Sequence, residues 1–353
     1  MRTSTIARLS VAWVLIVGSL LFGASPASAH TVEGAGPTNY LTQIDDVAPN
    51  LDGLELSVLE FGNRLKARNT TDAELVVLGY QGEPFLRIGP DGAFQNVNSP
   101  ATYLNADRQA KTTVPESADP EAEPKWQKIS DEPVTQWHDH RVHWMGEEPP
   151  PAVQKDPSKL VTIYGNWTVP MRLGSTEVSA SGTLRWVPAP SPIPWIALSV
   201  AVAAVLIGGA LTRRWRAVLA IGALLLVAVT VVQAVGIAMA PGSTGTAISR
   251  LLTGGIYIVP AWAAGLLGAR ALLRGNNDGA LGALLCGVIL GFVGGIMDIG
   301  VLFSSQVAFA APATAARAAV ALCLGLAVGV VVGDVVAFAK HETKGVAPAP
   351  ATA

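Results

Sequence analysis

The chain has 353 residues, half of them hydrophobic, and a formal net charge of −2. Charge is divided unevenly: residues 30–191 hold 13 basic and 22 acidic side chains, whereas residues 192–353 hold nine basic and four acidic ones. An acidic first half repels nucleic acid phosphates, so the composition argues against a DNA or RNA partner. Cys286 and Cys323 both fall in apolar runs of the second half. We therefore expect a first half that folds without disulfides and two unpaired thiols in the second.

The first 29 residues have the features of a secretory signal peptide. An apolar run at residues 11–22 follows two arginines and precedes a stretch of small residues that ends at Ala29. Cleavage after Ala29 would make His30 the first residue of the mature chain.

Residues 30–187 form the first domain, and from about Leu54 they show the alternation of apolar and polar side chains that is typical of half-buried strands. The alternation is clearest at residues 176–186, and residues 55–61 and 64–69 flank Gly62-Asn63, a pair suited to a two-residue hairpin turn. About seven strands without helical periodicity between them predict an all-β extracytoplasmic domain, an antiparallel β-sandwich of immunoglobulin-like type. The other expected segments are strands at 74–80, 85–88, 135–145 and 160–168, and an irregular loop at 99–133.

A proline-rich linker at residues 188–193 leads into a second, all-α domain at residues 194–340. It contains five apolar runs, each long enough to cross a hydrocarbon layer of about 30 Å as a helix. Basic residues follow the first, third and fifth runs, on the side that the positive-inside rule assigns to the cytoplasm. We predict a multi-pass plasma-membrane protein in contact with the lipid bilayer, with a disordered cytoplasmic tail at residues 341–353. The runs are 194–211, 217–239, 248–272, 280–303 and 315–338.

Glycines recur every four residues on the fourth and fifth runs. Such ridges let two helix backbones approach closely, so the two spans are expected to pack against each other. The glycines are Gly287, Gly291 and Gly295 on the fourth run and Gly325, Gly329 and Gly333 on the fifth.

Two carboxylates, Asp298 and Asp334, lie within these runs. Intramembrane carboxylates are costly and often functional. Arg250 and Arg317 fall at a similar predicted depth to Asp298, so a structural ion pair is one interpretation and a proton or cation path is the other.

Three of the five histidines fall in the short stretch at residues 137–145, between two tryptophans. On a strand, His138 and His140 would point to one face, while Asp139 and His143 would point to the other. Two imidazoles on one face can share a metal ion. The alternative interpretation is a buried polar cluster, with hydrogen bonds from the aspartate and the last histidine across the sheet.

A third ligand could come from His30, because a free terminal amine and its imidazole can chelate one ion together. Nitrogen-rich ligand sets favour Cu(II) over other first-row divalent ions. The candidate metal ligands are therefore His30, His138 and His140, with Asp139 and His143 as further candidates. The chain has no Gly-x-Ser-x-Gly elbow, phosphate loop or dinucleotide fingerprint, so no enzyme is predicted.

The order of a signal peptide ending in Ala-His, a β-sandwich and membrane helices resembles copper-resistance C-type domains, including those fused to a D-type membrane part. It is also similar to actinobacterial surface proteins. The copper-resistance resemblance implies copper binding by His30 and, loosely, by His138, Asp139 and His140. The histidine-aspartate spacing and the shorter membrane part depart from the family's pattern.

The leading functional prediction is a membrane protein whose extracytoplasmic domain binds a divalent metal, a copper ion, for storage or hand-off. The alternative is a metal-free surface interaction module, held by a five-helix anchor and serving an envelope protein partner. A third hypothesis is an enzyme or permease that uses Asp298 and Asp334.

Overall fold

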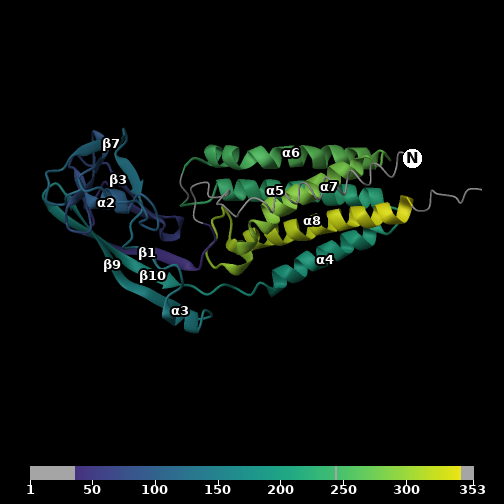
Figure 1. The fold of residues 1–353 in the computed structure, drawn as a ribbon, viewed down its shortest axis with the longest axis horizontal. Coiled ribbons are helices and arrows are strands. Elements are labelled where there is room, and N and C mark those ends of the chain that lie inside the picture. Colours follow the sequence, from purple (N-terminus) through teal and green to yellow (C-terminus); the bar gives the residue numbers. More distant parts are fainter. Residues whose placement is uncertain (1–35, 243–244, 343–353) are drawn as a thin grey trace, which may run out of the picture.

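The structure, a computed structural model, describes residues 36–242 and 245–342. A β domain and a helical domain follow each other along the chain and lie end to end (Figure 1). The predicted signal peptide, His30 and residues 343–353 of the predicted tail lie outside the described residues.

Antiparallel strands build the β domain, which confirms the predicted β class. The described part contains ten strands rather than about seven. The alternation that predicted the strand at residues 176–186 reflects burial: Val178, Ala180 and Leu184 are buried, and the polar residues between them are more exposed. The strands are β1 (Tyr40–Ala48), β2 (Leu54–Leu59), β3 (Arg64–Asn69), β4 (Leu75–Leu78), β5 (Pro84–Gly89), β6 (Gly92–Asn96), β7 (Trp126–Ser130), β8 (Val134–Trp137), β9 (Val161–Leu173) and β10 (Thr176–Trp186).

The strands form two sheets that share one hydrophobic core. The larger sheet has seven strands in the order β1-β10-β9-β4-β5-β6-β7, and the smaller has three in the order β2-β3-β8. Leu65 and Trp137 of the small sheet pack in the same buried cluster as Leu75, Ile88 and Met171 of the large sheet. Each sheet therefore has a face on this core.

The hairpin between β2 and β3 is confirmed, but its turn is longer than the predicted two residues. Glu60, Phe61 and Gly62 all have positive φ angles. A Cβ on Gly62 would lie 2.1 Å from Thr42 Oγ1, so this position requires glycine. The backbone N–H of Glu60 donates to the carbonyl of Gly242 in the helical domain (2.8 Å), a contact that local sequence patterns cannot reveal.

The expected irregular loop at residues 99–133 is partly wrong, because it contains the short helix α2 (Pro100–Leu104) and strand β7. Ser99 caps this helix, since its side chain accepts a hydrogen bond from Ala101 N, and proline follows at the first helical position. Strand β7 pairs with β6 at a sheet edge and is mostly exposed, so it lacks an apolar alternation. A second short helix, α3 (Pro151–Lys155), precedes β9.

Among its described residues, the helical domain has four helices that are long and apolar enough to cross a membrane. The fourth predicted run forms α7, then a π-helical turn (Gly291–Ile296) and a 3-10 turn (Ile299–Phe303). The third run forms a 27-residue helix, α6, whose described apolar part is Ile258–Leu273. The helices are α4 (Ile193–Ala210), α5 (Trp215–Ala238), α6 (Ala247–Leu273), α7 (Gly279–Leu290) and α8 (Ala313–Glu342).

Both glycine ridges lie where two helices approach closely, but they lie in two different helix–helix interfaces. A Cβ added at Gly291 would lie 2.6 Å from Ala327 Cβ on α8, so the expected packing of the fourth run against the fifth is confirmed. The ridge on α8 instead faces α4, where a Cβ at Gly329 would lie 2.7 Å from Leu206. Helix α8 therefore lies between these two neighbours.

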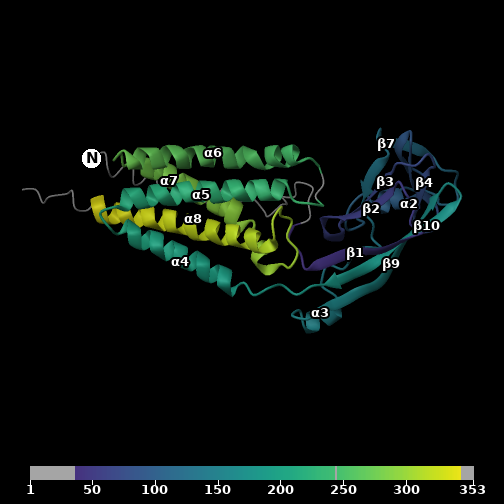
Figure 2. The same cartoon turned by 180° about the vertical axis from the view of Figure 1, so that it is seen from behind.

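The β domain docks onto one end of the helices, as both views show (Figure 1, Figure 2). Thr38 and Gln306 exchange two backbone hydrogen bonds of 3.0 and 2.8 Å, and Ser305 N donates to Asn39 Oδ1 (2.7 Å). The guanidinium of Arg317 donates to the carbonyl of Ser304 (2.7 Å), which holds this loop at the start of α8.

Candidate functional site

The histidine stretch follows β8 as a loop. The strand ends at Trp137, and residues 138–145 form turns and bends, so the predicted strand at 135–145 is wrong beyond residue 137. The reason is local: Asp139 accepts a hydrogen bond from Arg141 N, and Val142 N donates to the carbonyl of Asp139. Aspartate favours such turns, because its side chain competes for backbone hydrogen bonds.

Asp139 is the centre of a buried ion pair. Its carboxylate is 0% exposed and accepts from Arg141 Nε (2.7 Å), Arg141 Nη2 (2.6 Å) and Trp137 Nε1 (3.0 Å). Arg141 also donates to the carbonyl of Leu78 (3.1 Å), and its guanidinium lies over the ring of Tyr80. The hydrogen-bonding capacity of the carboxylate is thus used inside the protein.

Each of the three histidines has a ring nitrogen against a backbone carbonyl. His138 Nδ1 lies 2.7 Å from Asn63 O, and His140 Nε2 lies 3.1 Å from Asp107 O. His143 meets two carbonyls, that of Asp139 at Nδ1 (3.0 Å) and that of Arg108 at Nε2 (3.2 Å). These carbonyls fix the imidazoles to three separate segments of the β domain.

Within the described part of the chain, the four predicted ligands in this loop are not brought together as one metal-ligand group. The described residues contain no group of three or more His, Cys, Asp or Glu side chains that could hold a metal ion. The geometry matches the alternative interpretation, a buried polar cluster, since Asp139 is paired and both nitrogens of His143 face carbonyls. His30 lies outside the described residues, so copper binding that includes it stays a prediction.

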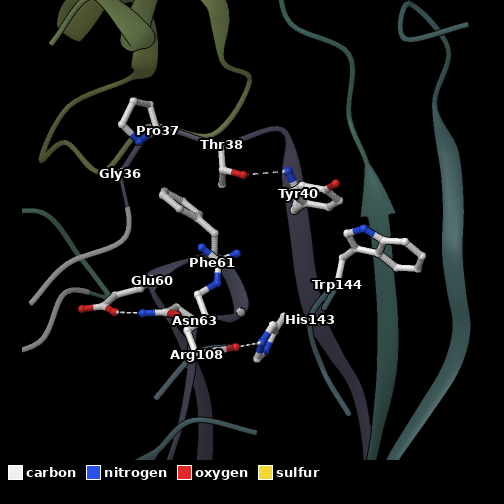
Figure 3. Close-up of a pocket in the computed structure, with 11 residues that line it drawn as sticks. Gly36, Pro37, Thr38, Tyr40, Glu60, Phe61, Asn63, Arg108, His143 and Trp144 are labelled. Atoms are coloured by element: carbon white, nitrogen blue, oxygen red, sulfur yellow. Dashed lines mark hydrogen bonds between the residues drawn. The ribbon is translucent and has the colours of Figure 1, made fainter. Parts of the chain in front are cut away.

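His143 lines a cavity of about 180 Å³ at the point where the described chain begins (Figure 3). The other walls include Gly36, Phe61, Arg108 and Trp144. His143 is 3% exposed, and burial lowers its pKa from 6.5 to about 4, more than its carbonyl contacts raise it. The imidazole is therefore neutral at pH 7.

The pH dependence of stability should report this buried imidazole. Between pH 6.5 and 4 the unfolded chain binds a proton that the folded chain does not, so stability is full above pH 6.5 and falls toward pH 4. The expected loss is about 3 kcal/mol, at about 1.4 kcal/mol per unit of pKa. Thermal melting of the full chain at pH 7.5 and 4.5 measures it. The variant His143→Gln should show a smaller pH-dependent loss, and an unchanged loss would contradict the assignment.

A larger cavity, of about 560 Å³, lies between the two domains, and we call it the junction cavity. Most of its lining is apolar. The cavity extends from the β1 and β2 segments of the β domain to the ends of α5, α6 and α8. Its walls include Pro37, Val58 and Phe61 of the β domain and Ile237, Val259, Phe309 and Val320 of the helical domain.

Polar groups gather on one side of the junction cavity, within the helical domain. Gln233 Nε2 donates to the carboxylate of Asp298 and to the carbonyl of Gly294 (2.8 Å). Nearby, Trp262 Nε1 donates to Thr230 Oγ1 (2.8 Å). All five residues line the cavity. We call this group the polar floor.

Asp298 does not form an ion pair with Arg317, so that part of the structural interpretation is wrong, whereas the side chain of Arg250 lies outside the described part of the structure. The guanidinium of Arg317 donates to loop carbonyls instead, and the carboxylate is held by Gln233. No hydrogen bond or ion pair is found for Asp334 in the described part of the chain. The expected free thiols are confirmed, because Cys286 and Cys323 are buried and unpaired.

Sequence reasoning missed Thr230, Gln233 and Trp262. A signal was present, because Thr230 and Gln233 are the uncharged polar side chains of an otherwise apolar span. Trp262 carries no such signal, since tryptophan is common near membrane interfaces.

Comparison of the chain with protein-family models, with curated proteins and with solved structures finds no match. The resemblance to copper-resistance domains therefore stays a prediction.

Proposed function

We propose that this chain is a five-span plasma-membrane protein that binds an apolar, lipid-type ligand in the junction cavity. The observation that carries the proposal is the cavity itself, with its large volume, mostly apolar walls and polar floor. Small-molecule sites have this character: apolar walls supply binding energy, and a few polar groups fix orientation.

The proposed topology places the β domain, as a two-layered sandwich, outside the membrane and the C-terminus in the cytoplasm. The shared core of the two sheets supports the sandwich. Helix α6, at 27 residues, spans about 40 Å at 1.5 Å per residue, which is enough for a fifth crossing. Arg213, Arg214 and Arg274 follow α4 and α6 and support this orientation.

The depth of the polar floor favours a ligand that enters from the bilayer. Gln233 lies five residues before the end of α5 at Ala238, which corresponds to about 7–8 Å along the helix. In the proposed topology this depth is within the outer leaflet. An amphiphile could reach the floor without leaving the hydrocarbon layer, and the β domain would cover the site.

Filling the cavity tests the proposal. Ala234 lines the junction cavity on α5, whereas Ala228 on the same helix is exposed and does not line it. We expect Ala234→Phe to weaken binding of twelve-carbon amphiphiles at least tenfold, because the ring occupies the apolar space. Ala228→Phe should leave binding unchanged. Native mass spectrometry of the full chain in a non-ionic detergent counts bound amphiphiles, and equal binding by the two variants would contradict the proposal.

The predicted envelope protein partner has no further support in the structure and stays a prediction. The histidine loop serves the fold of the β domain in this proposal. Copper uptake is not required for it.

A further inference from the structure

The charged residues of the junction cavity are of one sign. Glu60 and Asp298 line it, and no lysine, arginine or histidine is among the described lining residues. Glu60 accepts from Asn63 Nδ2 (2.7 Å) and lies 4.0 Å from Arg64 in the β domain. Among the side chains that the structure describes, none pairs with the carboxylate of Asp298 in this way, because Arg317 donates to the loop carbonyls.

The polar floor offers acceptors to a ligand and no free amide hydrogen. Both donor positions of Gln233 Nε2 are directed at protein acceptors, Asp298 Oδ2 and Gly294 O. This arrangement fixes the amide, because rotating it would place its oxygen against two acceptors. Gln233 is 4% exposed, and its Oε1 is buried without a hydrogen-bond partner in the described structure.

The carboxylate of Asp298 remains incompletely satisfied. Its Oδ2 accepts from Gln233, whereas no hydrogen bond reaches Oδ1 in the described part of the chain, and the residue is partly exposed on the cavity wall. An ionised carboxylate in apolar surroundings is unfavourable unless a positive charge or donors accompany it. A ligand that supplies a positive charge together with hydrogen-bond donors would therefore be stabilised beside Asp298.

A helix irregularity lies beside the polar floor. The π-helical turn Gly291–Ile296 interrupts the span just before Asp298, and such turns recur at functional sites. Gly294 lies in this turn, and a Cβ there would be 3.2 Å from both Gln233 Oε1 and Thr230 Cγ2. The indole of Trp262 adds an aromatic ring to the same wall, and aromatic rings attract cations.

We infer that the junction cavity selects an amphiphile with an ammonium head group, which binds Asp298 while its hydrocarbon chain lies along the apolar walls. This inference rests on the proposed function and adds the charge of the ligand. Carboxylate and phosphate heads are disfavoured, since the described lining has acidic groups and no basic ones.

The test compares three probes with the same chain: dodecylammonium, dodecanol and dodecanoate, each added to the full protein in a non-ionic detergent. We expect dodecylammonium to bind at least tenfold more tightly than the other two. Asp298→Asn should abolish this preference while dodecanol still binds, and Asp298→Glu should retain it. Asp278→Asn, which removes an exposed carboxylate at the start of α7, is the matched control and should change nothing.

The outcomes separate the two proposals. Binding of none of the probes would overturn the proposed function and this inference with it. Equal binding of all three, or an ammonium preference that survives in Asp298→Asn, would overturn the inference and leave the cavity as a binding site. If Asp298→Asn lowers the melting temperature strongly, the unmodified protein still tests the inference. Its preference for dodecylammonium over the other two probes supports the inference, and equal binding of all three overturns it.

Discussion

Replacing Asp139 with asparagine is expected to destabilise the β domain by about 3–5 kcal/mol, the cost of breaking a buried ion pair by removing one partner. Asp139 is fully buried and accepts two hydrogen bonds from the guanidinium of Arg141 at 2.6 and 2.7 Å. An amide would leave the arginine charge without compensation. In either orientation it would also turn an N–H group toward Arg141, and in one of them toward Trp137 Nε1–H as well, although both of these groups are donors.

Thermal melting of the full chain, combined with hydrogen exchange of β3 and β8, measures this effect. The matched control is Asp131→Asn, since Asp131 is 92% exposed and pairs with Lys128 on the surface. We expect no measurable change for the control, because exposed ion pairs contribute little. An Asp139→Asn variant that folds with unchanged stability would contradict this prediction. It would show that the carboxylate does not stabilise the β domain and would favour its role as a metal ligand.

The sequence predicts the regular elements well where burial is one-sided. Strand β10 has the predicted bounds, Thr176–Trp186, because its residues alternate between core and surface. The helices also lie close to the predicted apolar runs, since each run has the composition of a membrane span. In these elements the pattern of buried and exposed residues depends on one segment alone, so it can be predicted from the sequence of that segment.

The histidine stretch shows where such reasoning fails. Residues 137–145 fit a strand by composition, yet a hydrogen bond to Asp139 from the backbone of Arg141 turns the chain. The carbonyls that meet His140 and His143 belong to Asp107 and Arg108, more than 30 positions earlier. Contacts at this separation depend on the whole fold, so the pattern alone left the metal site and the polar cluster as alternatives.

The junction cavity could not be predicted for the same reason. It lies where the segment before β1 docks on the loop before α8, through the paired backbones of Thr38 and Gln306. Nothing in either domain's own periodicity specifies that docking. A partial signal is available in Asp298, because it is a carboxylate within an apolar run, although its hydrogen-bond partner is Gln233 and not the expected Arg317.

Replacing Gly268 with alanine is expected to separate α6 from α7 and destabilise the helical domain by about 1–3 kcal/mol, the usual cost of overpacking. A Cβ at Gly268 would lie 2.7 Å from both Ala283 N and Gly279 O. These are backbone atoms, which cannot move aside as a flexible side chain would. Small residues at such crossings let membrane helices pack closely.

Gly208 on α4 is the matched control, because a Cβ there would have nothing within 4 Å. Gly208→Ala should stabilise the helix slightly, by up to about 1 kcal/mol, since alanine favours helix more than glycine does. Both variants are unfolded under the same conditions by increasing the concentration of a denaturing detergent, and circular dichroism follows the loss of helix. The same chemical change should thus have opposite effects at the two positions. If both substitutions were neutral, the close approach of α6 and α7 would not be what holds this pair of helices together.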